Sequence, residues 1–120
     1  MKTIGIVGTR SRDSDEDFKI VKAKFLELYY IGDVICSGKC YKGADRFAEL
    51  LQKEYNTAKL WFPANWKKYG RKAGFIRNTD IARESDVLIA CVSKNRAGGT
   101  EDTIDKFIKF HGKNQLHIIH

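Results

Sequence analysis

Short runs of apolar residues alternate along this chain with longer segments in which apolar residues recur at helical spacing. A compact apolar run is typical of a strand that is buried on both faces of a parallel sheet. On this basis we expect five strands, over residues 3–7, 33–37, 58–62, 86–92 and 116–119. The first run, which ends at Gly8, is the expected central strand.

Four helical segments separate these strands. We expect helices from the cap-rich Ser14 to Gly32, from Gly43 to about Tyr55, from about Arg71 to Glu84, and from about Thr100 to Gly112. Alternation of strand and helix predicts a doubly wound sheet with right-handed crossovers. The expected fold class is therefore α/β: residues 1–120 form a single Rossmann-like three-layer domain with a mostly parallel five-stranded sheet.

The composition agrees with a chain that folds around one core. It has 120 residues, of which 42% are hydrophobic and 31% are charged, enough to cover one sheet with helices. No apolar run approaches the roughly 20 residues needed to span a bilayer, and the N-terminal residues enter a strand directly. We therefore expect a cytoplasmic protein with no membrane partner.

The cysteine count does not indicate a disulfide framework. Cys36, Cys40 and Cys91 are odd in number, so free thiols are expected. Cys36 and Cys40 could form half of a metal site, but there is no second pair, and the histidines lie near the C-terminus. We expect neither a metal ion nor another cofactor.

The net charge of +7 indicates an anionic partner or serves solubility. Six basic residues lie between Asn65 and Arg83, whereas Asp80 is the one acidic residue there. Such a concentration attracts phosphates, although a solvated helix face with lysines along it gives the same pattern.

Three glycine-bearing turns come after expected strands, at residues 8–10, 37–43 and 93–100. In an open parallel sheet, ligands bind beyond the carboxyl ends of the strands. The three turns should therefore face one crevice, together with the loop after Pro63. Glycines allow close approach of the backbone, and the free amides at a helix start favour an anion.

The same residues carry a resemblance. The motifs that carry it are, in chain order, Gly8-Thr-Arg10, Ser37-Gly38, Gly43-Ala-Asp-Arg46, Pro63-Ala-Asn-Trp66, Tyr69-Gly70, Ala73-Gly74, Arg77-Asn78 and Gly98-Gly-Thr100. Together they resemble the SLOG superfamily of Rossmann-like domains, and more narrowly its small stand-alone YspA-like members. The match covers nearly the whole chain in the right order. The resemblance implies a domain that binds nucleotides or nucleotide-derived ligands, in a superfamily that also contains the LOG phosphoribohydrolases and the DNA-processing protein DprA.

The ligand-binding residues expected from the turns and the resemblance are Gly8, Thr9, Arg10, Ser37, Gly38, Lys39, Gly43, Ala44, Asp45, Arg77, Asn78, Gly98, Gly99 and Thr100.

Several of these side chains have an expected role and an alternative. Arg77 could clamp a phosphate while the Asn78 amide bonds a base or ribose edge, or the pair could cap a neighbouring turn. Asp45 could bind a ribose or transfer a proton, or it could cap its helix. Arg10 and Lys39 come after strand ends and are expected to neutralise phosphate.

The last glycine turn departs from the pattern of the LOG enzymes, which carry Pro-Gly-Gly-x-Gly-Thr-x-x-Glu with a glutamate associated with cleavage of an N-glycosidic bond. Here Thr103 stands at the position of that glutamate. Glu101 and Asp102 are near, although a shift of one residue turns a helical side chain by about 100°. The catalytic candidates are therefore Asp45, Glu101 and Asp102.

These observations indicate three candidate functions. The first is binding of a small-molecule nucleotide or nucleotide derivative, as a sensor or processing domain. The second is a phosphoribohydrolase that cleaves the N-glycosidic bond of a nucleoside monophosphate. The third, ranked lower, is a DprA-like nucleic-acid module that uses residues 67–83 on phosphates. Trp66 and Tyr69 could stack on a base or cover the core. Assembly into a homo-oligomer is possible for each of these functions.

Overall fold

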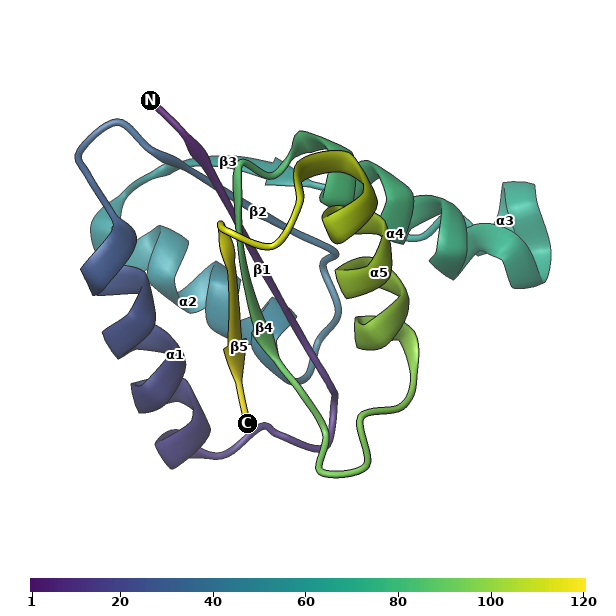
Figure 1. Cartoon of the computed structure of the whole chain (residues 1–120), viewed down its shortest axis with the longest axis horizontal. Helices are drawn as coiled ribbons and strands as arrows, with labels where there is room; N and C mark the ends of the chain where they lie inside the picture. Colours follow the sequence, from purple (N-terminus) through teal and green to yellow (C-terminus); the bar gives the residue numbers. More distant parts are fainter.

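A computed structural model, which describes residues 1–120, contains one five-stranded sheet in the order β3-β2-β1-β4-β5 (Figure 1). The strands are β1 (Thr3–Gly8), β2 (Val34–Ser37), β3 (Ala58–Trp61), β4 (Val87–Cys91) and β5 (Leu116–Ile119). Every pairing is parallel, so the sheet is entirely rather than mostly parallel. The α/β fold class and the central position of β1 are both confirmed.

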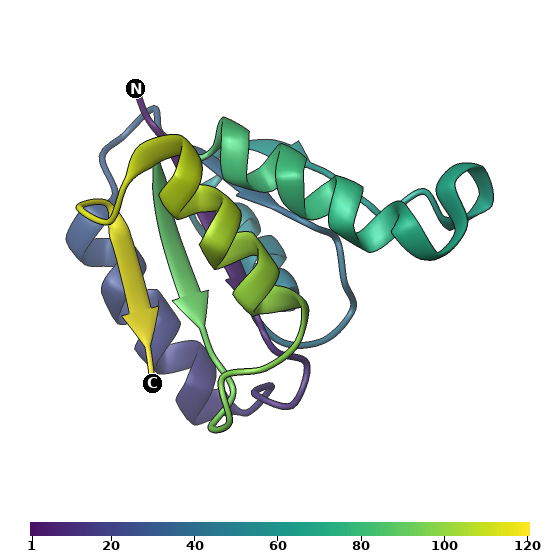
Figure 2. The same cartoon turned by 45° about the vertical axis from the view of Figure 1, so that its right-hand side comes forward.

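Helices cover both faces of the sheet, which makes three layers. They are α1 (Asp15–Leu28), α2 (Ala44–Tyr55), α3 (Trp66–Tyr69), the 3₁₀ turn η1 (Gly70–Lys72), α4 (Ala73–Glu84) and α5 (Gly99–His111). The pair α1 and α2 packs on one face and the pair α4 and α5 on the other (Figures 1 and 2). The short α3 projects to one side.

The two faces of the sheet explain why its strands are apolar throughout. Ile4 and Ile6 of β1 join Phe25 in the core beneath α1 and α2, whereas Val7 joins Phe107 beneath α5. Side chains that alternate along a strand thus enter two separate cores, and both must be apolar.

Helix boundaries differ from the sequence expectation at two places. Helix α1 begins after Ser14 in a capping box with Asp17, as expected, but it ends at Leu28 because Tyr29 adopts an extended backbone. The expected helix from Arg71 instead begins at Ala73. Before it, Gly70 has a φ of 58°, a conformation that favours glycine and separates the short α3 from α4.

Asp33 links the beginnings of the first two strands. Its Oδ1 accepts a hydrogen bond from the Lys2 amide (3.0 Å) and its Oδ2 one from the Tyr30 amide (2.9 Å), while the Lys2 ammonium forms an ion pair with Oδ2. Burial opposes ionisation of Asp33, but these hydrogen bonds and the Lys2 charge outweigh it. The pKa of this carboxyl therefore lies below its usual value of 3.8.

Asp33→Asn should lower the free energy of unfolding by about 1–3 kcal/mol at neutral pH, because it leaves a buried amide donor without its acceptor. The loss should shrink as the pH falls below 3.8 through the lowered folded pKa, since the wild-type carboxylate is then protonated. Urea unfolding of both proteins over this pH range measures the difference. Asp105→Asn, at an exposed carboxylate outside every ion pair, is the control. A loss that is equal at every pH would contradict the account.

Candidate functional site

A cleft of about 330 Å³ lies at the carboxyl edge of the sheet, beyond the ends of β1 and β4. The chain turns from β1 to a helix on one face and from β4 to a helix on the other (Figure 2). The connections that leave these two neighbouring strands thus run to opposite faces of the sheet. Open α/β sheets bind ligands at such a point.

Nine of the expected ligand-binding residues line the cleft. They are Gly8, Thr9, Arg10, Asp45, Arg77, Asn78, Gly98, Gly99 and Thr100. All three glycine-bearing turns reach this edge of the sheet, and those after β1 and β4 contribute glycines directly to the wall. The expected convergence of the three glycine-bearing turns is therefore present, whereas the loop after Pro63, which was also expected here, contributes no residue to the cleft.

Three of the expected residues face other surroundings. Lys39 forms an ion pair with Glu49 (2.9 Å), away from the cleft. Gly43 has a φ of 73°, and a Cβ there would lie 2.6 Å from the Thr9 carbonyl oxygen. Ala44 is fully buried against the first turn. Gly43 and Ala44 therefore hold the turn after β1 in position and do not line the cleft.

Gly38 also lies outside the cleft wall, but its lack of a side chain leaves the space that the Arg77 guanidinium occupies. A Cβ at Gly38 would overlap the Arg77 guanidinium and lie 2.9 Å from Asp45 Oδ2. Without a side chain at this position, Arg77 Nη1 donates to the Gly38 carbonyl oxygen (3.0 Å) and Nε donates to Asn78 Oδ1 (3.0 Å). The Nη2 group makes no hydrogen bond or ion pair, so Arg77 presents a free donor and a positive charge to the cleft.

Asn78 is a positioning residue. Its Nδ2 donates to the Gly99 carbonyl oxygen (3.3 Å) and to Asp102 Oδ2 (3.1 Å), and its Oδ1 accepts from Arg77. Both ends of the amide are thus occupied, which leaves it little capacity for a base or ribose. The residue instead joins α4 to the start of α5.

Asp45 lines the cleft and is 8% exposed. Its Oδ2 accepts from the Cys40 amide (3.1 Å), and its Oδ1 is 2.9 Å from Ser37 Oγ, which is also 2.6 Å from the Ile6 carbonyl oxygen. A single hydroxyl hydrogen can serve only one of these two oxygens. When Ser37 donates to Ile6, a proton on Asp45 would complete the second contact.

Burial also raises the pKa of Asp45, although its hydrogen bonds and the nearby arginines act in the opposite direction. Ser37 is fully buried beneath this carboxyl and does not reach the cleft. Asp45, the one carboxyl group that lines the cleft, is therefore suited to carry or exchange a proton.

The beginning of α5 supplies a further polar part of the cleft wall. The Gly99 and Thr100 amides have no hydrogen-bond partner, and no side chain caps the helix. Gly98 has a φ of 105°, which glycine readily adopts. Arg10 lines the same cleft with its side chain outside every hydrogen bond and ion pair. Free amides, the helix dipole and two arginines make this end of the cleft electropositive.

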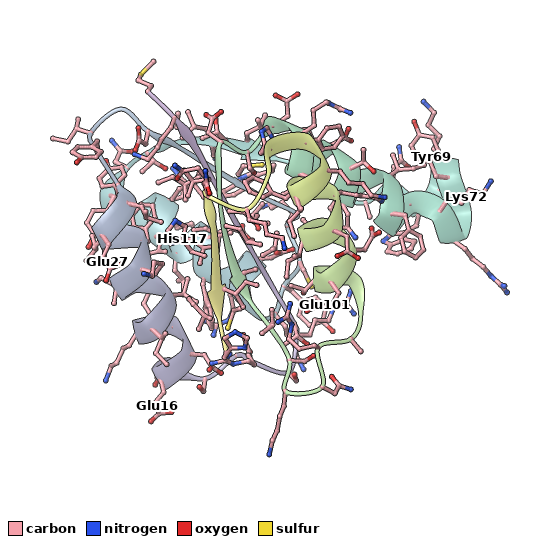
Figure 3. The ribbon with its side chains drawn as sticks, in the orientation of Figure 1. Glu16, Glu27, Tyr69, Lys72, Glu101 and His117 are labelled. Atoms are coloured by element: carbon pink, nitrogen blue, oxygen red, sulfur yellow. The ribbon has the colours of Figure 1, made fainter.

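Other candidate residues lie outside the cleft. Glu101, labelled in Figure 3 at the start of α5, forms an ion pair with Arg96 (2.9 Å). Asp102 pairs with Lys106 (2.9 Å). Trp66 and Tyr69 belong to the projecting α3, so they neither wall the cleft nor cover the core.

The cleft also contains five residues that were not among the expected ligand-binding positions: Val7, Cys40, Ile81, Ala97 and Thr103. Thr103 could have been found from spacing, because it lies one helical turn after Gly99 and so shares its face. Cys40 owes its position to the irregular loop after Lys39, whose φ of 63° no pattern indicates.

No group of three or more His, Cys, Asp or Glu side chains is arranged to hold a metal ion. None of the helices combines the length and apolar composition needed to cross a membrane.

The Asp45 carboxyl should titrate above 3.8 and the Asp33 carboxyl below it, so that each serves as the other's control. Arg77→Ala should raise the Asp45 midpoint further, because the arginine charge favours the carboxylate, and should leave Asp33 unchanged. Carboxyl ¹³C NMR over the acidic range measures both. An Asp45 midpoint at or below 3.8 would show that burial does not dominate at this site.

Comparison of the chain with models of protein families, with curated proteins and with solved structures finds no match.

Proposed function

We propose that the cleft binds a nucleoside phosphate or a related nucleotide derivative. The observation that carries the proposal is the meeting, in one cleft, of two unpartnered helix amides, two free arginine donor groups and a buried carboxyl. These groups are complementary to the two polar parts of a nucleotide, its phosphate and its ribose.

The phosphate would lie at the start of α5. Gly99 and Thr100 offer their amides, and the absence of a Cβ at Gly99 permits close approach of the anion. Arg77 adds charge and its free Nη2 group, and Arg10, whose guanidinium has no partner, can bind phosphate through two parallel donors. Charge-assisted hydrogen bonds of this kind are worth roughly 1.5–3 kcal/mol each.

The ribose would lie toward Asp45. Its carboxyl is held by Ser37 and the Cys40 amide, so it is fixed in orientation before a ligand arrives. A sugar hydroxyl can donate to a carboxylate, or accept from a protonated carboxyl. The volume of about 330 Å³ is at the lower end of typical small-ligand sites, which favours a mononucleotide-sized ligand.

The resemblance to the SLOG superfamily supports the same ligand class, since its members bind nucleotides or molecules derived from them. It also raises a second candidate function, cleavage of an N-glycosidic bond. Asp45 favours this candidate because it alone of the three candidate carboxylates lines the cleft. Binding remains the first proposal, because Thr103 stands where the LOG enzymes have their glutamate.

Nucleoside phosphates should stabilise the fold. A ligand at 100 times its dissociation constant adds roughly 2.7 kcal/mol to the free energy of unfolding, which is a rise of several degrees in Tm. A thermal-shift panel of mono-, di- and cyclic nucleotides and ADP-ribose derivatives measures it. If no member of the panel moves Tm, the cleft is not a nucleotide site.

Gly38→Ala should weaken nucleotide binding about 10- to 100-fold while the domain stays folded, because its Cβ displaces Arg77 from the cleft. Gly74→Ala is the matched control. Its Cβ meets the Trp66 ring at an ordinary 3.5 Å, and alanine favours the helix. Titration calorimetry with circular dichroism separates binding from folding. Equal affinities for the two variants would exclude Arg77 from the site.

Release of free base from AMP should be slow or absent, because one carboxyl group alone faces the cleft. A positioned acid or base contributes about 10²–10⁴-fold, so Asp45→Asn should remove whatever release occurs. Glu101→Gln and Asp102→Asn should retain it, since both side chains lie outside the cleft. Chromatography of the reaction mixture measures the base. Rapid release that survives Asp45→Asn would overturn this assignment.

A further inference from the structure

The segment Trp66–Lys72, here named the basic arm, projects from the domain. It consists of α3 and η1, and it extends sideways from the start of α4 (Figures 1 and 2). None of its residues is buried. Tyr69 and Lys72, labelled in Figure 3, lie on this projecting segment, to one side of the sheet.

The length of this connection is not required by the fold. Eleven residues, 62–72, join β3 to α4, whereas strand-to-helix connections in such domains usually take about 2–6. Long ordered connections of this kind are commonly functional. The arm packs against the start of α4, where Trp66 lies beside Gly74.

The charge of the arm is uncompensated. Lys67, Lys68, Arg71 and Lys72 take part in no ion pair and no side-chain hydrogen bond. The Lys68 ammonium lies over the Tyr69 ring, 5.1 Å from its centre. The first acid after these four cations in the chain is Asp80. Cations elsewhere are often paired, such as Lys22 with Glu54 at 2.6 Å. The arm therefore concentrates free positive charge on a protruding surface.

The same surface exposes aromatic rings. Trp66 is 56% exposed and Tyr69 is 40% exposed, and the two are one turn apart on α3. Residues at this spacing lie on the same side of a helix. Large aromatic rings left in water beside free cations have the composition of a surface that stacks bases and neutralises phosphates.

We propose that the basic arm binds single-stranded nucleic acid. Trp66 would stack on one base and Tyr69 on the next, through the ring face that Lys68 does not cover, while the cations contact the flanking phosphates. A duplex keeps its base faces covered, so the rings favour a single strand. An anionic membrane is the weaker alternative, because the arm has no aliphatic side chain to enter a bilayer.

Fluorescence anisotropy of the full chain with a labelled single-stranded oligonucleotide tests the proposal. We expect binding at low salt, with a slope of log K against log salt of about −3 for four phosphate contacts. Lys67→Glu with Arg71→Glu should weaken binding at least tenfold. Lys19→Glu with Lys113→Glu makes the same change in net charge at exposed lysines outside every ion pair, and it should weaken binding less than about threefold.

The aromatic contribution is tested separately. Trp66→Ala should lower affinity about 5- to 100-fold, and Trp66→Phe should recover most of it because stacking survives. Gly38→Ala, which disturbs the cleft, should leave oligonucleotide affinity unchanged and so separates this proposal from nucleotide binding in the cleft.

Three results would overturn the proposal. The first is equal loss in the two charge-reversed variants, which would indicate general electrostatic attraction. The second is equal affinity for duplex and single strand. The third is tighter binding to anionic phospholipid vesicles than to the oligonucleotide, which would assign the arm to a membrane surface.

Discussion

Parallel hydrogen bonding of β1 to both of its neighbours is the constraint on which the rest of the molecule depends. It brings the carboxyl ends of the strands to one edge, and there the chain must turn into helices on opposite faces. The turn after β1 is tight. A Cβ at Gly8 would lie 2.8 Å from the Cys91 carbonyl oxygen and 2.8 Å from the Ala44 Cβ. Glycine thus lets α2 approach β1 and leaves the cleft open beside β4.

The fold could be predicted from the sequence because its signals are local and agree with one another. Apolar runs such as Val87–Cys91 are typical of strands that are buried on both faces of a covered parallel sheet, and Ser14 and Gly112 lie at helix ends. The position of the cleft could be inferred from the same topology. What the sequence could not predict was the direction of single side chains, because that depends on tertiary partners: Lys39 turns to Glu49.

The cleft, which Arg77 and Asn78 of α4 help to line, and the basic arm, which precedes α4, offer different chemistry. In the cleft, Arg77 and Asp45 are fixed by backbone groups of the β2 turn, so a ligand would meet groups that are already oriented. On the arm, the cations form no ion pair and Trp66 and Tyr69 are exposed, which suits a flexible polymer. Asn78 connects the cleft to α5, so the glycine turn and Arg77 should move together on binding.

The most direct test of the central claim is ¹H–¹⁵N NMR of the full chain during titration with AMP. Binding in the cleft predicts that the largest shifts belong to the Gly99 and Thr100 amides and to the side chain of Arg77, with little change in the arm. Shifts confined to residues 66–72, or no shifts at saturating AMP, would contradict a nucleotide site at this edge of the sheet.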